Sequence, residues 1–371
     1  MSIPSSTSDH QHPKIAIFAI GGAGVNTLNE LITTGVTGCH LFALDTDKQS
    51  LGGSLASSRI VLGTELCKGL GSGADPKNGT QAAMATKEQL SAALSGYELI
   101  YIIAGMGGGT GGGASIVLAQ LAKAGNIRTI AICTRPFAFE GKRRRRNAEQ
   151  SIGDLCREVD LCIVVPQQQL LSDTELKIMH EIYQHSSRLI VYAVTGMLRI
   201  QLNKWVESQQ AIQHQGLGYI GMATASGTAC VEQALKQAAV APTLADVSLR
   251  NVELMLAAVM TGQEVSESQV STTLKLLGSV KTNILTDVMQ HDMMPEEARA
   301  VIVVAGCKKQ YKQDPVIART YPKSNEMAGG SPSHGVGGAF SEEQRRPRLW
   351  RVETPSERGG KAKDEESSSD E

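Results

Sequence analysis

The chain has 371 residues, which is long enough for two domains with separate cores. Its formal net charge of −1 and its pI near 6.7 do not favour nucleic acid as a partner. The segment Ser2–Pro13 contains no apolar signal-peptide stretch, and no apolar run reaches membrane-spanning length. The seven cysteines show no CxxC spacing, so we predict reduced thiols in a cytoplasmic protein, with no disulfide and no metal site.

In chain order, apolar runs alternate with helical patterns, which predicts a doubly wound parallel sheet of the α/β class. The first strand, Lys14–Ile20, is followed by the glycine turn Gly21–Asn26 and a helix over Thr27–Thr33. The next strand, His40–Leu44, ends at Asp45, and an acid at this place binds a ribose hydroxyl in Rossmann proteins. Further strands are predicted at Ile60–Leu62, Leu99–Ile103, Thr129–Cys133 and Leu161–Val165, with a helix over Gln81–Ala93.

The segment Gly105–Gly113 is the strongest functional signal, because it joins a strand to a helix predicted over Ala114–Ala124. Glycine permits positive φ and close approach of the backbone to an anion, and a helix N-terminus offers unpaired N–H groups. Two more glycine-rich loops, Gly21–Asn26 and Lys68–Pro76, suit the same purpose. We therefore predict a phosphate cradle without a Walker lysine, in which Gly109 has positive φ and faces a phosphate oxygen.

The second half of the chain begins with a long helix predicted over Glu175–Ile200. After it we predict a smaller α/β domain with a mixed sheet, whose strands are Tyr219–Ala225, Val252–Val259, Asn283–Val288 and Ala300–Ala305 and whose helices are Thr228–Ala238 and Ser266–Leu277. The predicted organisation is a disordered segment 1–13, a nucleotide domain 14–175, a central helix 176–200, a second domain 201–310 and a disordered tail 311–371.

Together with Thr134–Arg144, the three glycine-rich loops resemble FtsZ, the tubulin-like GTPase family of bacterial cell division, over roughly residues 14–307. The segment Gly105–Gly113 departs from the family pattern only at Gly112, which is commonly threonine. The resemblance implies the tubulin/FtsZ fold, GTP with Mg²⁺, and head-to-tail filaments of this chain. It also implies a cytoplasmic protein at the division site that binds a division or membrane-tethering adaptor through its tail.

By position, the resemblance assigns phosphate binding to Gly22, Ala23, Gly24, Val25, Asn26, Gly107, Gly108, Gly109, Thr110 and Gly111. It places Glu140 on the ribose and Arg144 near the nucleotide. A solvated loop acid is the alternative for Glu140, and a solvated helix face is the alternative for the basic run Lys142–Arg146.

The base-binding positions depart from the family. Tyr183 can stack on a base, but the position five residues later, where the family has an acid that reads guanine, is Arg188. Guanine presents N1–H and 2-amino donors at this edge, and arginine has only donors. Arg188 therefore faces O6 and N7, or turns to solvent and leaves Ser187 as an acceptor, and we predict weakened preference for GTP over ATP.

The segment after the long helix also departs from the family, which has an asparagine and two acids there. Here Leu202–Gln209 contains Asn203 and one acid, Glu207, as candidate catalytic residues. We predict slow hydrolysis that requires assembly, because the family supplies this segment to the neighbouring subunit's nucleotide. A surface acid beside Lys204 is the alternative for Glu207.

The predicted function is thus a GTP-binding filament protein of cell division with hydrolysis coupled to assembly. One alternative is a structural paralogue that binds nucleotide without hydrolysing it. A Rossmann-type dinucleotide-dependent oxidoreductase is another alternative. Such an enzyme predicts a single phosphate loop and a catalytic cluster, whereas this sequence has three phosphate-type loops and no obvious catalytic cluster. In the tail, Arg345–Arg351 fits a docking peptide or an anionic membrane surface, and an inert solvated tail is the alternative.

Overall fold

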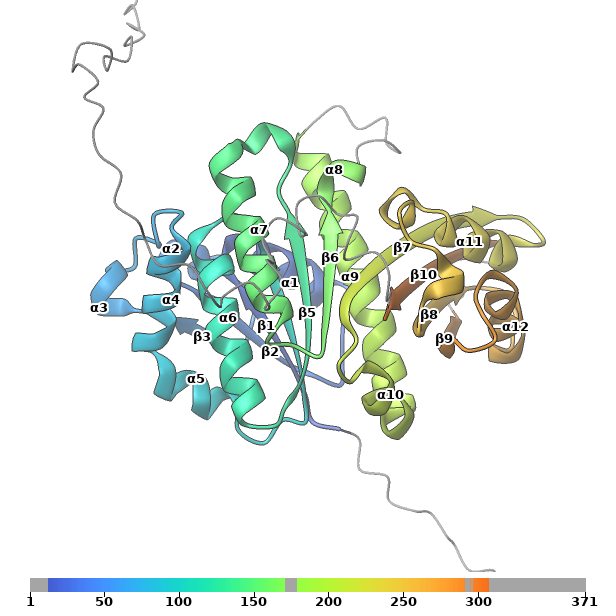
Figure 1. Cartoon of the computed structure of the whole chain (residues 1–371), viewed down its shortest axis with the longest axis horizontal. Coiled ribbons are helices and arrows are strands. Elements are labelled where there is room, and N and C mark those ends of the chain that lie inside the picture. The colour runs from blue at the N-terminus through green and yellow to red at the C-terminus, as the bar shows by residue number, and fades with distance from the viewer. Residues whose placement is uncertain (1–12, 171–178, 291–293, 295, 307–371) are drawn as a thin grey trace, which may run out of the picture. The chain divides into compact units, whose positions relative to one another are not determined.

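The computed structural model describes residues 13–170, 179–290, 294 and 296–306. The predicted tail, its segment Arg345–Arg351 and the first residues of the predicted long helix lie outside these ranges. Ten strands form one continuous sheet in the order β3-β2-β1-β4-β5-β6-β7-β10-β8-β9 (Figure 1). Their bounds are β1 Ile15–Ile20, β2 His40–Asp45, β3 Ser58–Val61, β4 Leu99–Gly105, β5 Arg128–Arg135, β6 Leu161–Pro166, β7 Gly216–Ser226, β8 Leu254–Thr261, β9 Asn283–Gln290 and β10 Glu297–Ala305.

The helices differ from the predictions mainly at their starts. The segment Gly21–Asn26, expected to be a glycine turn, is the start of α1. In Gly105–Gly113 the turn covers only Met106–Gly108, and α6 begins at Gly109. The helix predicted over Gln81–Ala93 is two helices that meet at Thr86. The bounds are α1 Gly21–Thr33, α2 Lys48–Gly52, α3 Thr64–Cys67, α4 Pro76–Ala85, α5 Lys87–Leu94, α6 Gly109–Ala124, α7 Lys142–Cys156, α8 Gln167–Leu170, α9 Met179–Asn203, α10 Trp205–Ile212, α11 Cys230–Ala239 and α12 Glu267–Leu277.

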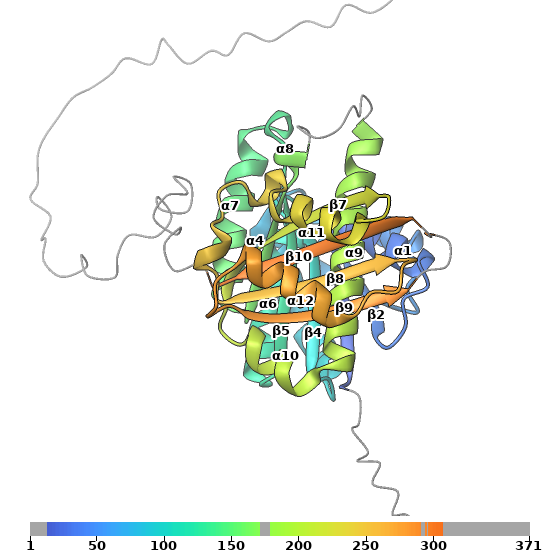
Figure 2. The ribbon, with the colours of Figure 1, turned by 90° about the vertical axis from the view of Figure 1, so that its right-hand side faces the viewer.

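The strand directions confirm the predicted fold class. Strands β3, β2, β1, β4, β5, β6 and β7 pair in parallel, as expected for a doubly wound sheet. Strand β10 then pairs antiparallel with β7 and with β8, and β8 pairs in parallel with β9, so the C-terminal part of the sheet is mixed. Figure 2 shows β10, β8 and β9 running across the direction of β4 and β5.

The core lies on both faces of the sheet because successive side chains of a strand point to opposite faces. In β1, Ile15 and Ile17 contribute to the core under α1 and α9, whereas Ala16 and Phe18 contribute to the core under α4 to α7. A third core packs α11 and α12 on the C-terminal strands. Helix α9 packs against α1 and also against β8, β9 and β10, so it joins the parallel and mixed parts of the sheet.

Two further expectations concern the cysteines and the membrane. Cys156, at the end of α7, and Cys162, in β6, form a disulfide, so the prediction of reduced thiols throughout is wrong for this pair. The turn between the two elements brings their Cα atoms to 5.3 Å, a separation that sequence spacing alone does not reveal. None of the helices in the described ranges combines the length and the apolar character needed to cross a bilayer.

Candidate nucleotide-binding site

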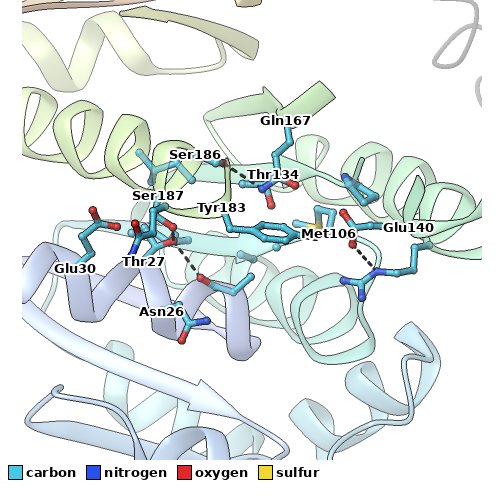
Figure 3. Close-up of a pocket in the computed structure, with 18 residues that line it drawn as sticks. Asn26, Thr27, Glu30, Met106, Thr134, Glu140, Gln167, Tyr183, Ser186 and Ser187 are labelled. Carbon is cyan, nitrogen blue, oxygen red and sulfur yellow. Dashed lines mark hydrogen bonds and ion pairs between the residues drawn. The ribbon is translucent and has the colours of Figure 1, made fainter. Parts of the chain in front are cut away.

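A cavity of about 700 Å³ opens at the carboxyl ends of β1, β4 and β5. This is where the strand order reverses, since β2 lies on one side of β1 and β4 on the other. The helices that follow β1 and β4 therefore leave on opposite faces of the sheet, which is the geometry in which doubly wound folds bind ligands. Figure 3 shows the cavity with Glu30 and Ser187 near one end, Tyr183 in the middle, and Met106 and Glu140 near the other.

The first turns of α1 and α6 lie against each other because their glycines permit it. Gly21 has φ +74°, and a Cβ on it would lie 3.1 Å from the Gly111 nitrogen. A Cβ on Gly24 would lie 2.5 Å from the carbonyl oxygen of Ile103 in β4. A side chain at Gly21 would separate the two helix starts, and one at Gly24 would push α1 away from β4. Two sets of unpaired N–H groups are thus brought together at the edge of the cavity.

The predicted phosphate-binding residues fall into two groups. Ala23 and Asn26 line the cavity. Gly108 faces open space, since a Cβ on it would have no protein atom within 4 Å, whereas a Cβ on Gly22 would lie 3.7 Å from the hydroxyl oxygen of Ser50. Val25 is instead buried in the core under α1. Ala23, Val25 and Asn26 have different surroundings because they lie on α1, where each successive residue points in a different direction.

The expectation for Gly109 is wrong in its physical reason. Gly107 has positive φ, at +98°, whereas Gly109 does not, and a Cβ on Gly109 would lie 2.7 Å from the carbonyl oxygen of Asp75. Gly109 is therefore required for packing against the Lys68–Pro76 loop. The hydroxyl of Thr110 is likewise engaged within the protein, at 2.7 Å from Thr46 Oγ1.

Glu140 and Tyr183 stand on adjoining walls of the cavity. Glu140 accepts a hydrogen bond from the Phe137 N–H at 2.8 Å, and its other carboxylate oxygen lies 3.2 Å from Arg144 Nε. The Tyr183 ring meets the Phe137 ring edge to face at 5.4 Å between centroids, and it remains exposed enough to stack on a ligand. Burial and the charge of Glu140 raise the pKa of Tyr183 above its usual value near 10.

Several cavity residues were not found from the sequence. Gln167 donates to Ser186 at 3.1 Å. Thr27 lies 3.3 Å, oxygen to oxygen, from Ser187, the one residue of these four that the sequence analysis named. Glu30 lines the cavity as well. Its spacing from Asn26 along α1 is the one sequence signal that points to it, because residues four apart share a helix face.

Two positions do not reach the cavity. Arg188 is outside its lining residues and pairs instead with Glu30, at 3.4 Å between Nε and Oε1. Asp45, the acid expected to hold a ribose in a Rossmann protein, is buried and accepts hydrogen bonds from the N–H groups of Thr46 and Asp47. Asp45 thus fixes its own turn.

The candidate catalytic residues lie near the other end of α9. Tyr183 and Asn203 are twenty residues apart on this helix, which corresponds to about 30 Å. Asn203 donates to Asp287 at 2.8 Å, and Lys204 pairs with Glu267. Glu207 is exposed on α10, so the expected loop after the long helix is a short helix.

The arrangement suits a nucleotide better than other ligands. Helix starts with unpaired N–H groups favour phosphate, and an exposed aromatic ring favours a base. The part of the chain that the structure describes has no cluster of three or more histidine, cysteine, aspartate or glutamate residues able to hold a metal ion. The side chains that line the cavity supply hydroxyl and amide groups and the guanidinium of Arg144, together with the two acids Glu30 and Glu140.

Comparison with known proteins extends this interpretation. Residues 14–175 match the family described as Tubulin/FtsZ family, GTPase domain. The cell division protein FtsZ of Coxiella burnetii is 31% identical over 306 residues, covering 80% of this chain and 79% of that protein. The chain belongs to the tubulin/FtsZ family. The resemblance noted from the glycine-rich loops is thereby confirmed, and the oxidoreductase alternative loses its support.

Other members of the tubulin/FtsZ family are similar over most of the chain. FtsZ 1 of Pyrococcus abyssi is 29% identical over 331 residues, covering 84% of this chain and 88% of that protein. An FtsZ dimer from M. jannaschii has a TM-score of 0.77 at 26% identity, covering 80% of this chain and 89% of its own. A GTPγS-bound protofilament of CetZ2 from Haloferax volcanii has a TM-score of 0.69 at 18% identity, covering 82% and 97%, and shows the shared fold.

Proposed function

We propose that this chain binds GTP in the cavity that is lined by α1, by α9 and by the carboxyl ends of β4 and β5. The observation that carries the proposal is the pair of glycine-rich helix starts, held together at one edge of a cavity that also exposes Tyr183 and Glu140. In this arrangement Gly22 and Gly108 hold phosphates, Glu140 contacts the ribose, and Tyr183 stacks on the base. Mg²⁺ would accompany the nucleotide and would neutralise part of the charge of its phosphates.

We also propose head-to-tail assembly into filaments in the cytoplasm at a division site. The support is the separation along α9 between the cavity at Tyr183 and the exposed acid Glu207 on α10. Stacking copies along this direction places the α10 end of one chain over the cavity of the next. The similar FtsZ of M. jannaschii was solved as a dimer, and CetZ2 of Haloferax volcanii as a protofilament. An adaptor bound through the C-terminal tail completes the proposal.

Hydrolysis in such a filament needs an acceptor that orients the attacking water. Glu207 is the acid that the α10 end offers, and we expect Glu207→Gln to lower turnover by roughly 10²–10⁴-fold while binding and pelleting persist. Gln210→Ala, an exposed change on the same helix, is the matched control. Turnover that is unaffected by Glu207→Gln would remove this residue from the reaction.

A second candidate function is a nucleotide-binding filament protein that does not hydrolyse GTP. It is favoured by Asn203, whose amide is bonded to Asp287 and is thus already occupied within its own subunit. The two candidates differ in concentration dependence. Shared-site hydrolysis gives turnover per subunit that rises once the protein assembles, whereas the second candidate gives none above background.

The deciding experiment combines nucleotide titration with sedimentation of the purified full chain. We expect GTP to bind, and GTP to be required for pelleting. Absence of binding by any nucleoside triphosphate would overturn the proposal. Binding without pelleting at any protein concentration would overturn the assembly part alone.

A further inference from the structure

The acid expected on α9 for base recognition is absent at Arg188, yet a carboxylate stands at the same end of the cavity. Ala23, Asn26, Thr27 and Glu30 all line the cavity, and their spacing of three, four and seven residues places them on one face of α1. Seven residues of helix correspond to about 10 Å. Glu30 is thus two turns beyond the helix start that faces the phosphates.

Arg188 holds Glu30 from outside the cavity. Its Nε lies 3.4 Å from Glu30 Oε1, and its side chain is 58% exposed, against 27% for Glu30. A carboxylate has two acceptor oxygens with about four hydrogen-bonding directions. Arg188 takes one side of this group, which leaves acceptor capacity for a ligand. The neighbouring bond between Thr27 and Ser187 ties α1 to α9 at the same level (Figure 3).

The electrostatics of Glu30 fit a ligand group that donates hydrogen bonds. Burial raises the pKa of Glu30, whereas the charge and the hydrogen bond of Arg188 oppose this rise. A phosphate beside this carboxylate would be repelled, so this end of the cavity suits the base. Guanine offers N1–H and the 2-amino group side by side, whereas adenine presents the lone pair of N1 there and would be repelled.

We infer that Glu30 on α1 is the residue that selects guanine, and that Arg188 is a positioning residue that orients its carboxylate. The inference rests on the proposed binding of a nucleoside triphosphate in this cavity. It replaces the expectation that the arginine weakens base selection. In this chain the selecting acid comes from α1, and α9 contributes the cation that holds it.

The test is a competition measurement with GTP, ITP and ATP on the full chain. ITP keeps the N1–H donor of GTP but lacks the 2-amino group. Glu30→Gln leaves one acceptor oxygen, so we expect the affinity for GTP relative to ATP to fall by roughly 10- to 100-fold, with the GTP-to-ITP ratio approaching one. Arg188→Met is expected to give a smaller loss of selectivity, and Arg188→Lys to retain most of it.

Two controls separate selection from folding and from stacking. Glu88→Gln, an exposed change on α5, should leave all three affinities unchanged. Tyr183→Ala should lower all three affinities together, by roughly 10- to 100-fold for a lost base stack. A Glu30→Gln protein that melts like the Glu88→Gln protein but keeps the wild-type GTP-to-ATP ratio would overturn the inference and leave GTP binding intact. A wild-type chain that binds none of the three nucleotides would overturn both.

Discussion

The two ends of α9 differ in how their polar groups are used. At the Tyr183 end, the helix faces a cavity of about 700 Å³ whose wall includes hydroxyls, three side-chain amides, two acids and one arginine. At the other end, Asn203 and Arg199 both bond to the buried carboxylate of Asp287 on β9. Groups paired within the protein stabilise the fold, whereas groups that line open space are available to a ligand. The comparison therefore assigns ligand binding to the Tyr183 end of α9 and mainly stabilisation of the fold to the Asn203 end.

The largest effect expected on GTP binding is at the cavity edge. Gly108→Val should weaken GTP binding by roughly 100-fold, because the added side chain occupies space that the protein leaves open for phosphate. Its φ of −81° and ψ of 174° suit any residue, so the protein should fold and melt normally.

Gly52→Val is the matched control for this change. Gly52 also has open space where a Cβ would lie and lacks positive φ, but it ends α2 away from the cavity-lining residues. Isothermal titration with GTP should separate the two variants. Equal affinity in the Gly108 and Gly52 variants would mean that the open space at α6 does not hold phosphate.

Much of the fold could be predicted from the sequence, because apolar runs bounded by glycine and charge mark the buried strands. Lys14–Ile20 and Leu99–Ile103 correspond to β1 and β4 within two residues at each end. The helix starts were misplaced because glycine has low helix propensity, and this preference is overridden by the packing of α1 against α6. The local sequence pattern around these glycines does not reveal that α1 packs against α6.

The site was predictable only where one segment carries the whole signal. The glycine segments were located, but the pairs Thr27 with Ser187 and Glu30 with Arg188 join residues about 160 positions apart. Only the packing of α1 on α9 brings them together. No residue of these two pairs belongs to a recognisable motif, so the role of each pair becomes visible only when the fold brings its members together. The same holds for Asp45, whose burial and backbone bonds exclude the ribose role that its sequence position suggests.

A second prediction tests whether the Asn203 end of α9 stabilises the fold. Asn203→Ala removes the bond to Asp287 and should lower the free energy of unfolding by about 1.5 kcal/mol, the lower end for bonds to charged groups, because Asn203 is exposed. GTP affinity of the monomer should not change. Chemical denaturation and GTP titration measure the two quantities. Unchanged stability with a sharp loss of turnover would instead make Asn203 catalytic and would contradict the comparison.

The smallest expected effect is the titration of Tyr183 at the cavity end. Burial, and then the negative charge of Glu140, raise the pKa of its hydroxyl above 10, while Arg144 opposes the shift. The folded state thus disfavours the tyrosinate, so its contribution to stability is complete below pH 10 and is lost as the pH rises through the folded pKa. GTP binding should accordingly be insensitive to this group up to about pH 9.

The measurement is the tyrosinate absorbance of the wild type minus that of Tyr183→Phe, followed against pH. The difference should titrate above pH 10, and Glu140→Gln should move it downward, because a charge that opposes ionisation is removed. A difference curve centred below pH 10 would contradict the assigned surroundings of the ring. A curve that Glu140→Gln leaves in place would show that burial alone sets the shift, and that the base and ribose walls of the cavity do not influence each other.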